Sequence, residues 1–447
     1  MTAPTLDLLI AQEHDPSRRV VLRDATVLTG RAGDGPVRGD LLLVGSRIAA
    51  LGTVDATGPG LESAVVVDLD GAIVMPGLID AHLHAWEGQL RGMAPDADFD
   101  TYLDLAHRNL APHYRPEDSH IGNLATALAC LDAGITTIID NSHNTRSHEH
   151  GVAAVDGLLA SGIRAVHAAG APLFGTWDLP LGDHLDKLAT HLSGAGDLLT
   201  LRLMEGGPTL ENWRVAAERG LWVSTEVIDA EWLAAVAGPH ATDLARAGHT
   251  FNHCVDLHPE AWQFIVDAGI QVNVCPRSDS HFGVGPAYPA VDEARAVGLL
   301  PGLSSDNELS YSIDMFTEMR VLLHQQRARH HQARRTGDQT IARLSAAEAL
   351  EMATLGGAHN AGLGARTGSL EVDKEADLVI LDPVGSGVVP PADPVAAAVL
   401  FAHPGTVAGV FVGGRVRKWD GALVGVDTAA VRSAAERSRR RLVSAAL

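Results

Sequence analysis

The pattern of hydrophobic and polar positions changes twice along the chain. The first 75 residues contain short runs rich in Val, Ile and Leu, at 18–30, 39–52 and 63–77, separated by Gly, Asp and Pro. Runs of this kind predict β-strands joined by tight turns. We therefore expect a small β layer at the start of the chain.

From about residue 77 to 364, short apolar runs alternate with amphipathic segments. The stretch 116–134 is typical: Pro116 suits the first position of a helix, and an apolar stripe of Ile121, Leu124, Leu128 and Leu131 follows. Gly134 can then end the helix in a left-handed conformation. An apolar strand, ITTIID, follows directly.

Eight strands can be counted in this region. They are the run before His82, the run that ends at Asp140, and 163–168, 198–203, 221–227, 250–255, 270–275 and 300–306. Eight strands alternating with helices predict an α/β fold, a closed (β/α)8 TIM barrel.

Strand texture returns near the end of the chain. A capping box at Ser345 and Glu348 starts one more helix, and two strand-rich segments follow at 367–382 and 405–421. We expect them to complete the N-terminal β layer, giving a composite β-sandwich domain of residues 1–75 and 365–425. The barrel would then span 76–364 and a helical tail 426–447, while the polar stretch 324–339 suits an exposed helix end and loop.

Charge and cysteine content limit the classes of binding partner and the cellular compartment that we expect. With 34 basic and 55 acidic residues the formal net charge is −21, which disfavours nucleic acid and anionic membranes as partners. Cys130, Cys254 and Cys275 form no CxxC motif, the acidic N-terminus does not suit a secretory signal, and no apolar run is long enough to span a bilayer. We expect a cytoplasmic protein.

In a barrel of this kind the reacting groups lie at the C-terminal ends of the strands. The polar residues at those ends are His82, His84, Asp140, Ser142, His143, His167, Glu205, Glu226, His253, Arg277 and Asp306. A single strand histidine is more often a packed core residue, but the two at i and i+2 point to one side of the same strand. With Asp306 from the last strand, they suit a Zn²⁺ or Fe²⁺ site.

The motifs around these residues resemble those of the amidohydrolase superfamily. They are MPGLIDAHLHAWEGQLRG, NHCV, CPRSDSHFGVGPAYP, GLSSDNELSYSIDMFTEMR and TGSLEVDKEADLVILD, and they occur in the expected order over nearly the whole chain. They look most like the branch that holds adenosine-type, cytosine and S-adenosylhomocysteine deaminases and triazine hydrolases.

The resemblance implies metal ligands at His82, His84 and Asp306, with His253 next to the metal-bound water and a catalytic glutamate at Glu226. Relatives carry one more ligand histidine three residues before that glutamate, where this chain has Val223.

Three interpretations of the missing ligand stay open. His253 could become a fourth ligand, a neighbouring group such as Glu205, His143 or His167 could take its place, or the site could hold no metal. Only three lysines exist, and the one in the barrel region, Lys187, lies in a helical segment. Two metals bridged by a modified lysine are therefore not expected, and we predict one divalent metal, Zn or Fe.

With a metal present, we expect hydrolytic deamination or displacement of a similar group. The metal would supply hydroxide near neutral pH, Asp306 and His253 would take and orient its proton, and Glu226 would protonate a ring nitrogen or the leaving amine. Glu226 could otherwise be a structural carboxylate paired with an arginine. Two further hypotheses are a weakly metallated or metal-free lyase or isomerase and a binding protein that kept the pocket.

Four residues are candidates for substrate binding. Trp86 and Arg91, in the loop after the first barrel strand, could stack on a planar ring and pair with a polar group; they could equally pack under the loop and bind backbone carbonyls. His143 and Glu205 lie near the same mouth, and Glu205 could instead bond to its own loop. A small molecule is the expected substrate, and the family resemblance implies a dimer or larger assembly.

Overall fold

The computed structural model of the protein describes residues 3–175, 177, 179–228, 231, 233, 244–382 and 387–446. The chain forms two compact units, each built from several segments. The first consists of 1–79, 130–137 and 314–426, and the second of 80–129, 138–313 and 427–447.

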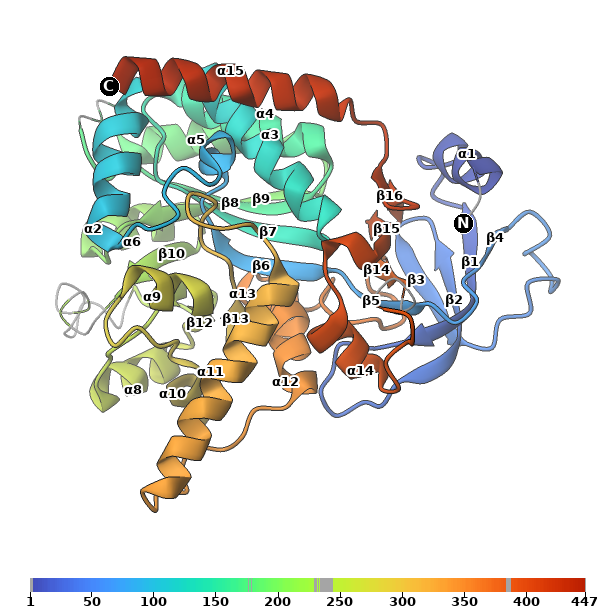
Figure 1. Ribbon diagram of the computed structural model, residues 1–447. Coiled ribbons are helices and arrows are strands. Elements are labelled where there is room, and N and C mark those ends of the chain that lie inside the picture. Colours follow the sequence, from blue (N-terminus) through green and yellow to red (C-terminus); the bar gives the residue numbers. More distant parts are fainter. Residues whose placement is uncertain are drawn as a thin grey trace. The chain divides into compact units, whose positions relative to one another are not determined.

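A nine-stranded mixed sheet lies in the first unit (Figure 1). Its strands are β1 (Arg19–Val27), β2 (Val37–Val44), β3 (Arg47–Gly52), β4 (Val65–Asp68), β5 (Ile73–Pro76), β14 (Leu378–Leu381), β15 (Val407–Val412), β16 (Arg415–Trp419) and β17 (Ala422–Leu423). The order is β17-β16-β15-β14-β5-β1-β2-β3, and β4 pairs with β1. The antiparallel pair β5 and β14 joins strands from the two ends of the chain, as the sequence predicted.

This sheet has its own apolar core, because alternate residues of its strands point to one buried face. Leu22, Leu41, Leu378 and Phe411 are fully buried members of that core. Trp419 of β16 packs against the same cluster.

The second sheet is an eight-stranded parallel barrel in sequence order from β6 to β13. Its strands are β6 (Leu78–Leu83), β7 (Ile135–Ser142), β8 (Arg164–Ala169), β9 (Leu199–Glu205), β10 (Val223–Val227), β11 (Thr250–His253), β12 (Gln271–Val274) and β13 (Gly302–Leu303). A bridge between Leu83 and Asp306 brings the last strand back to the first. The predicted fold is therefore confirmed, and the strands surround a buried interior as in other barrels.

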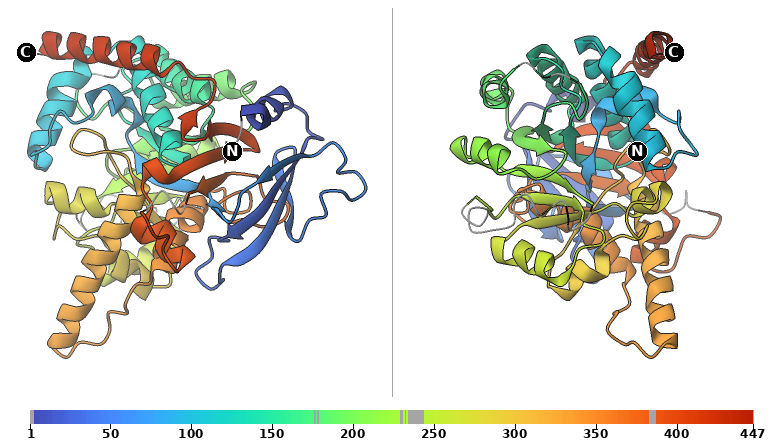
Figure 2. Two further views of the ribbon diagram at one scale, coloured as in Figure 1. Left: turned by 45° about the vertical axis from the view of Figure 1, so that its right-hand side comes forward. Right: turned by 90° about the vertical axis from the view of Figure 1, so that its left-hand side faces the viewer.

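Helices alternate with the barrel strands, and further helices belong to the first unit (Figure 2). They are α1 (Ala3–Ala11), α2 (Phe99–Tyr102), α3 (Pro116–Asp132), α4 (His148–Ser161), α5 (Leu181–Leu192), α6 (Leu210–Glu218), α8 (Pro259–Ala268), α9 (Pro276–Phe282), α10 (Val291–Ala296), α11 (Met315–Arg335), α12 (Ala346–Glu351), α13 (Gly357–Asn360), α14 (Pro394–Ala396) and α15 (Thr428–Ala446). Short 3-10 segments lie at Ala85–Leu90, Ala111–His113 and Pro404–Thr406, and π-helical ones at Leu103–Leu110, Met352–Gly356 and Ala397–Phe401.

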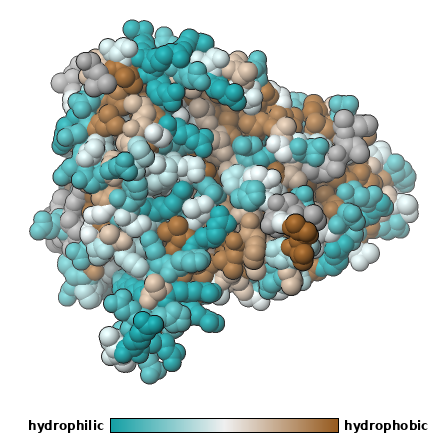
Figure 3. Space-filling view, in the orientation of Figure 1, coloured by the Kyte–Doolittle hydropathy of each residue, from teal (hydrophilic) through white to brown (hydrophobic). Residues whose placement is uncertain are grey.

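Local sequence signals account for several helix ends. Gly134 has φ +82° directly after α3, so the left-handed turn needs a residue without a side chain. The capping box of Ser345 and Glu348 is present at the start of α12. The polar stretch 324–339 forms the end of α11 and the loop after it, and Figure 3 shows this part as hydrophilic.

The last helix, α15, belongs to the second unit. Leu442 is fully buried, and Ser438 Oγ donates to Asp118 Oδ1 at 2.6 Å. Arg441 also pairs with Asp118. No helix among the described residues is both long and apolar enough to cross a membrane.

Candidate active site

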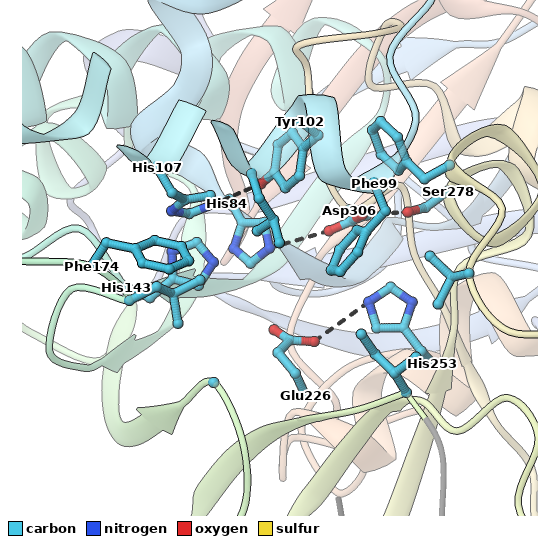
Figure 4. A pocket seen from close by; sticks show the side chains of 16 residues that line it. His84, Phe99, Tyr102, His107, His143, Phe174, Glu226, His253, Ser278 and Asp306 are labelled. Carbon is cyan, nitrogen blue, oxygen red and sulfur yellow. Dashed lines mark hydrogen bonds and ion pairs between the residues drawn. The ribbon is translucent and has the colours of Figure 1, made fainter. Parts of the chain in front are cut away.

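The C-terminal ends of the barrel strands bring His84, Glu226, His253 and Asp306 to one end of a cavity of about 260 Å³ (Figure 4). His82 is fully buried within hydrogen-bonding distance of Asp306. These five residues come from four different strands or strand ends, so only barrel closure can bring them together.

Asp306 is the centre of the cluster. Its Oδ1 lies 3.1 Å from His82 Nε2 and 3.2 Å from His84 Nε2. Two backbone hydrogen bonds hold the two strand ends together, from His84 N to Asp306 O at 2.9 Å and from Asp306 N to His82 O at 3.0 Å. The spacing between the two imidazoles and the carboxylate is therefore set by the backbone.

Asn141 at the end of β7 contacts both imidazoles from behind. His84 Nδ1 lies 2.8 Å from the Asn141 carbonyl oxygen and must donate to it, so Nε2 is the ring nitrogen that could bind a metal. The Asn141 side-chain amide lies 2.8 Å from His82 Nδ1. Partners of this kind set the orientation and tautomer of metal-binding histidines.

Glu226 and His253 face each other across the polar end. Glu226 Oε2 lies 3.4 Å from His253 Nε2, and Glu226 Oε1 lies 3.6 Å from His82 Nε2. On its far side His253 Nδ1 lies 2.8 Å from Oδ1 of Asp279. The sequence reading did not single out Asp279, although it follows Pro276 in the first turn of a helix that begins directly after β12.

The ionisable groups of this cluster shift one another's pKa values. Burial raises the pKa of Asp306, but the bonds from His82 and His84 outweigh it and hold the pKa well below its ordinary value. Burial lowers the pKa of His84, yet the contact with Asp306 brings it to about 9. The pKa of Glu226 is also lowered, because His82 and His253 outweigh its burial. The ionised carboxylates of this cluster therefore favour the presence of a cation or a protonated imidazole beside them.

Two residues of the cluster have unusual backbone conformations. His253 has φ +68° and Asp306 has φ +73°, in the left-handed region that residues with side chains rarely adopt. Such conformations gather at functional sites, where the surrounding fold holds them in place.

Two groups among the described residues could hold a metal ion. One consists of His82, His84 and Glu226, and the other of His82, His253 and Cys275. In each group the possible ligand atoms lie within 4.8 Å of one another. Glu226 and Cys275 thus each complete a possible ligand group that includes His82, and the sequence analysis named neither as the replacement for the missing imidazole.

Strand β10 explains why Val223 does not contribute. Its side chain is buried and its backbone N donates to His249 Nδ1 at 3.2 Å. Thr225 shares its face of the strand, since side chains alternate, and bonds to Glu205. Ser224, on the other face with Glu226, accepts a hydrogen bond from Asn252 at 3.3 Å.

Trp86 and Arg91 are not among the residues that line the cavity. Trp86 is 1% exposed and packs edge-on against His107 and Tyr114. Arg91 Nε lies 3.6 Å from Glu308 Oε1, and half of its side chain is exposed. In this placement Trp86 is covered by its own loop, which is the alternative interpretation, and Arg91 points to Glu308; their contacts with substrate stay a prediction.

Glu205 does not line the cavity either. Its carboxylate accepts hydrogen bonds from Trp213 Nε1 at 2.7 Å, from Thr225 Oγ1 at 2.9 Å and from Thr209 N at 3.1 Å. The side chain points toward α6 and also bonds to β10, which agrees with the alternative of a structural carboxylate; its contact with substrate stays a prediction. His167 is likewise engaged, with Nδ1 2.8 Å from Asp140 Oδ2.

His143 lines the cavity, as expected, and its ring stacks on His84 with centroids 4.0 Å apart. Two lining residues that the sequence reading missed, Tyr102 and His107, lie next to it. The Tyr102 hydroxyl donates to the buried Glu87 Oε1 at 2.8 Å and lies 3.2 Å from His107 Nε2. His107 belongs to a π-helical segment, a feature often found at functional sites, and no sequence pattern marks it.

Comparisons with known proteins agree with this architecture. The chain is 27% identical over 449 residues to a 5-methylthioadenosine/S-adenosylhomocysteine deaminase of Pelotomaculum thermopropionicum, covering 95% of this chain and 99% of the relative. It is also 27% identical over 426 residues to an enzyme of the same name from Moorella thermoacetica, covering 89% of this chain and 94% of that one. Both relatives are named as deaminases, and both are 27% identical in sequence to this chain.

Two solved structures share the fold. An adenosine deaminase from Xanthomonas campestris with bound zinc superposes with a TM-score of 0.80 at 21% identity, covering 95% of this chain and 98% of that one. A variant of atrazine chlorohydrolase from Arthrobacter aurescens, complexed with zinc and atraton, gives 0.81 at 20% identity, covering 95% and 100%. The profile of the amidohydrolase family matches residues 73–417, more than half of the sequence. The chain therefore belongs to the amidohydrolase family.

Proposed function

We propose that the protein is a metal-dependent hydrolase of a C–N bond in a small nitrogen-containing cyclic or amidine compound, and that it acts by hydrolytic deamination. One observation carries the proposal: imidazole and carboxylate groups converge at the polar end of a single cavity, with N···O separations of 3.1–3.6 Å. The deaminase names of the relatives support the reaction class.

His82, His84 and Asp306 would hold the metal, since Asp306 lies 3.1 and 3.2 Å from the two imidazoles. The Glu226 carboxylate forms a possible ligand group with the same two histidines. Their donor atoms are 3.1–3.6 Å apart, as expected for ligands about 2.0–2.2 Å from a common cation. Nitrogen and oxygen donors of this kind suit Zn²⁺ or Fe²⁺. When bound, such a cation lowers the pKa of a water molecule toward ~7.

The chain's own residues would move the protons. Asp306, whose pKa is held low, is ionised at neutral pH and can accept a proton from the attacking water. Glu226 faces the cavity and is also ionised, because its pKa is lowered, so it would first take a proton from the attacking water and then deliver it to a ring nitrogen or to the leaving amine. His253, held by Asp279 at 2.8 Å, would orient the water and the carboxylate.

The reaction balances with water alone. Water adds its oxygen to an electron-poor ring carbon, the C–N bond to the amino group breaks, and the nitrogen leaves as ammonia with the protons passed by Glu226. The product carries a carbonyl in place of the amine. No redox partner is needed.

Cys275 offers a second ligand arrangement, because its thiol lies close to His82 and His253. Burial raises the pKa of this thiol to about 12, so it is a thiol unless a cation displaces the proton. Cobalt substitution separates the two arrangements, since a thiolate ligand adds an intense charge-transfer band that nitrogen and oxygen ligands lack. We expect no such band, and the Cys275→Ser variant is the matched control.

The test combines metal analysis with ammonia release from aminated purines, pyrimidines and triazines. We expect about one zinc or iron per chain and release of ammonia from at least one compound. A Glu226→Gln variant should keep its metal and lose about 100- to 10,000-fold in turnover. Glu205 is a buried carboxylate outside the cavity, so the Glu205→Gln variant should keep a metal content and a turnover close to those of the parent protein.

The alternative functions give different results in the same experiment. A protein that holds no metal after purification with zinc present would favour the lyase or isomerase hypothesis, which the valine at position 223 motivates. Full turnover by Glu226→Gln would contradict the mechanism proposed for either enzyme.

A further inference from the structure

The cavity wall away from the histidine and carboxylate cluster is apolar. Phe99, Leu103, Leu173, Phe174, Phe282 and Val284 line it, together with Tyr102 and Ile228 (Figure 4). Leu173 is the most exposed member of this apolar wall, at 36%. Its side chain packs so closely against Gly206 that a Cβ there would lie 2.3 Å from Leu173 Cδ2.

The wall holds few polar groups. His107 is buried, and burial lowers its pKa to about 3, so it carries no charge near neutral pH. His143 is also buried, with its ring stacked on His84. Outside the polar end, the described lining residues therefore present two buried imidazoles, one tyrosine hydroxyl and hydrocarbon.

Two arginines next to Phe174 bind other groups. Arg108 lies 4.4 Å from the centre of the Phe174 ring and pairs with Asp104. Arg146 donates to the carbonyl oxygens of Ala111 at 2.8 Å and Phe174 at 3.1 Å. Neither is among the lining residues.

We propose that the substrate is an uncharged, flat nitrogen heterocycle with a short apolar substituent, and that the apolar wall selects against ionic substituents. This rests on the proposed function, which places the aminated ring at the polar end. A charged group in the wall would lose its water without gaining a partner, which is strongly unfavourable. The volume of about 260 Å³ suits a ring with a short chain.

The inference distinguishes the two compounds in the relatives' names, because 5-methylthioadenosine is uncharged and carries a short apolar group, whereas S-adenosylhomocysteine is ionic. S-adenosylhomocysteine, named in the curated relatives, ends in an amino acid with both an ammonium and a carboxylate. Among the described lining residues, nothing outside the polar end could pair with either group. Both would have to be desolvated against phenylalanine and leucine side chains.

Binding to the zinc-loaded protein tests this directly, by calorimetry with matched probes. The probes are adenine, cytosine and amino-1,3,5-triazine, each with a butyl chain, and the same rings with a chain that ends in carboxylate or ammonium. For at least one ring we expect the butyl probe to bind at least about tenfold more tightly than both charged partners. Equal or tighter binding of a charged probe in every series, or no binding of any probe, would overturn the inference.

A Leu173→Lys variant adds an internal check, with Leu173→Gln as the uncharged control. Because Leu173 is partly exposed, both variants should fold. Lysine should shift the preference toward the carboxylate probe by about tenfold relative to glutamine, since it supplies the missing cation. An unchanged preference would mean that the chain of the probe does not contact this wall, and would overturn the inference.

Ammonia release from the same probes keeps the two proposals apart. Tight binding of a butyl probe without ammonia release would contradict the proposed deamination and leave the substrate class standing. Deamination of a charged probe with the higher kcat/KM would support deamination and contradict the substrate class.

Discussion

The two ends of the cavity differ in what builds them. The polar end consists of strand termini, and its His82, His84 and Asp306 are joined by backbone hydrogen bonds that close the barrel. The apolar wall consists of segments between strands: α2 and the π-helical segment Leu103–Leu110 after β6, the residues after β8 and β10, and α9 with the residues after it.

This difference teaches where chemistry and specificity are decided. A reacting group on a strand end keeps its position because the hydrogen-bonded sheet holds it. A wall of connecting segments can change without disturbing the sheet, so relatives with one fold can select different substrates. The predictions below disturb one end or the other.

The largest effect is expected at the polar end, from Asp306→Asn. The amide carries no charge to balance His82 and His84, so metal content should fall close to zero and turnover by at least about 1,000-fold. Elemental analysis and ammonia release measure both. Glu308→Gln, a buried carboxylate two residues away, should retain its metal, and an Asp306→Asn protein with one metal per chain would contradict the assigned ligand.

A smaller effect is expected behind the ligands. Asn141→Ala removes the amide that lies 2.8 Å from His82 Nδ1, so His82 loses its orienting contact. Metal affinity should weaken by about 10- to 100-fold, as for other partners of metal-binding histidines. Competition with a chelator measures it. Asn123→Ala, another fully buried asparagine, is the control and should leave the affinity unchanged.

At the wall, Tyr102→Phe removes the hydroxyl between Glu87 and His107. His107 would lose a partner worth about 1 kcal/mol, so KM should rise about fivefold with little change in kcat. Tyr114→Phe is the matched control, because the Tyr114 hydroxyl bonds to the Trp86 carbonyl and does not line the cavity. A fall in kcat alone would place Tyr102 in the chemistry instead.

The smallest effect on turnover is expected from Glu87→Gln. This substitution should instead change how the stability of the protein depends on pH. Burial raises the pKa of Glu87 from 4.5 to about 8 in the folded protein. Between these values the folded state keeps a proton that the unfolded chain has lost, so this group lowers the unfolding free energy as pH rises. In urea denaturation between pH 5 and 8, the unfolding free energy should decline less steeply with pH for the variant than for the parent. Identical declines would contradict the raised pKa of Glu87.

Sequence reasoning worked where local pattern and chain order suffice. The strand count predicted the barrel, and the pairing of β5 with β14 confirmed that both chain ends build the other sheet. The spacing of His82 and His84 placed both imidazoles beside Asp306, as observed. Their roles as metal ligands, and those of Glu226 and His253 in catalysis, stay predictions.

The direction of side chains in loops could not be predicted from the sequence in the same way. Trp86 and Arg91 follow β6 closely, yet one packs beneath its loop and the other points to Glu308. Glu205 lies at a strand end but on the face that points to α6. Asp279 and His107 reach the site from helical segments, where position along the chain does not show what lies nearby.

The amino-acid sequence by itself determined the alternation of strands and helices, the shared face of the two histidines and the absence of an imidazole at position 223. Periodicity carries that information because side chains alternate regularly along a strand. Only the tertiary structure decided which groups surround the missing ligand and what the rest of the cavity presents to a substrate. Those contacts join residues more than a hundred positions apart, and their distances depend on how the barrel closes and how its connecting segments pack.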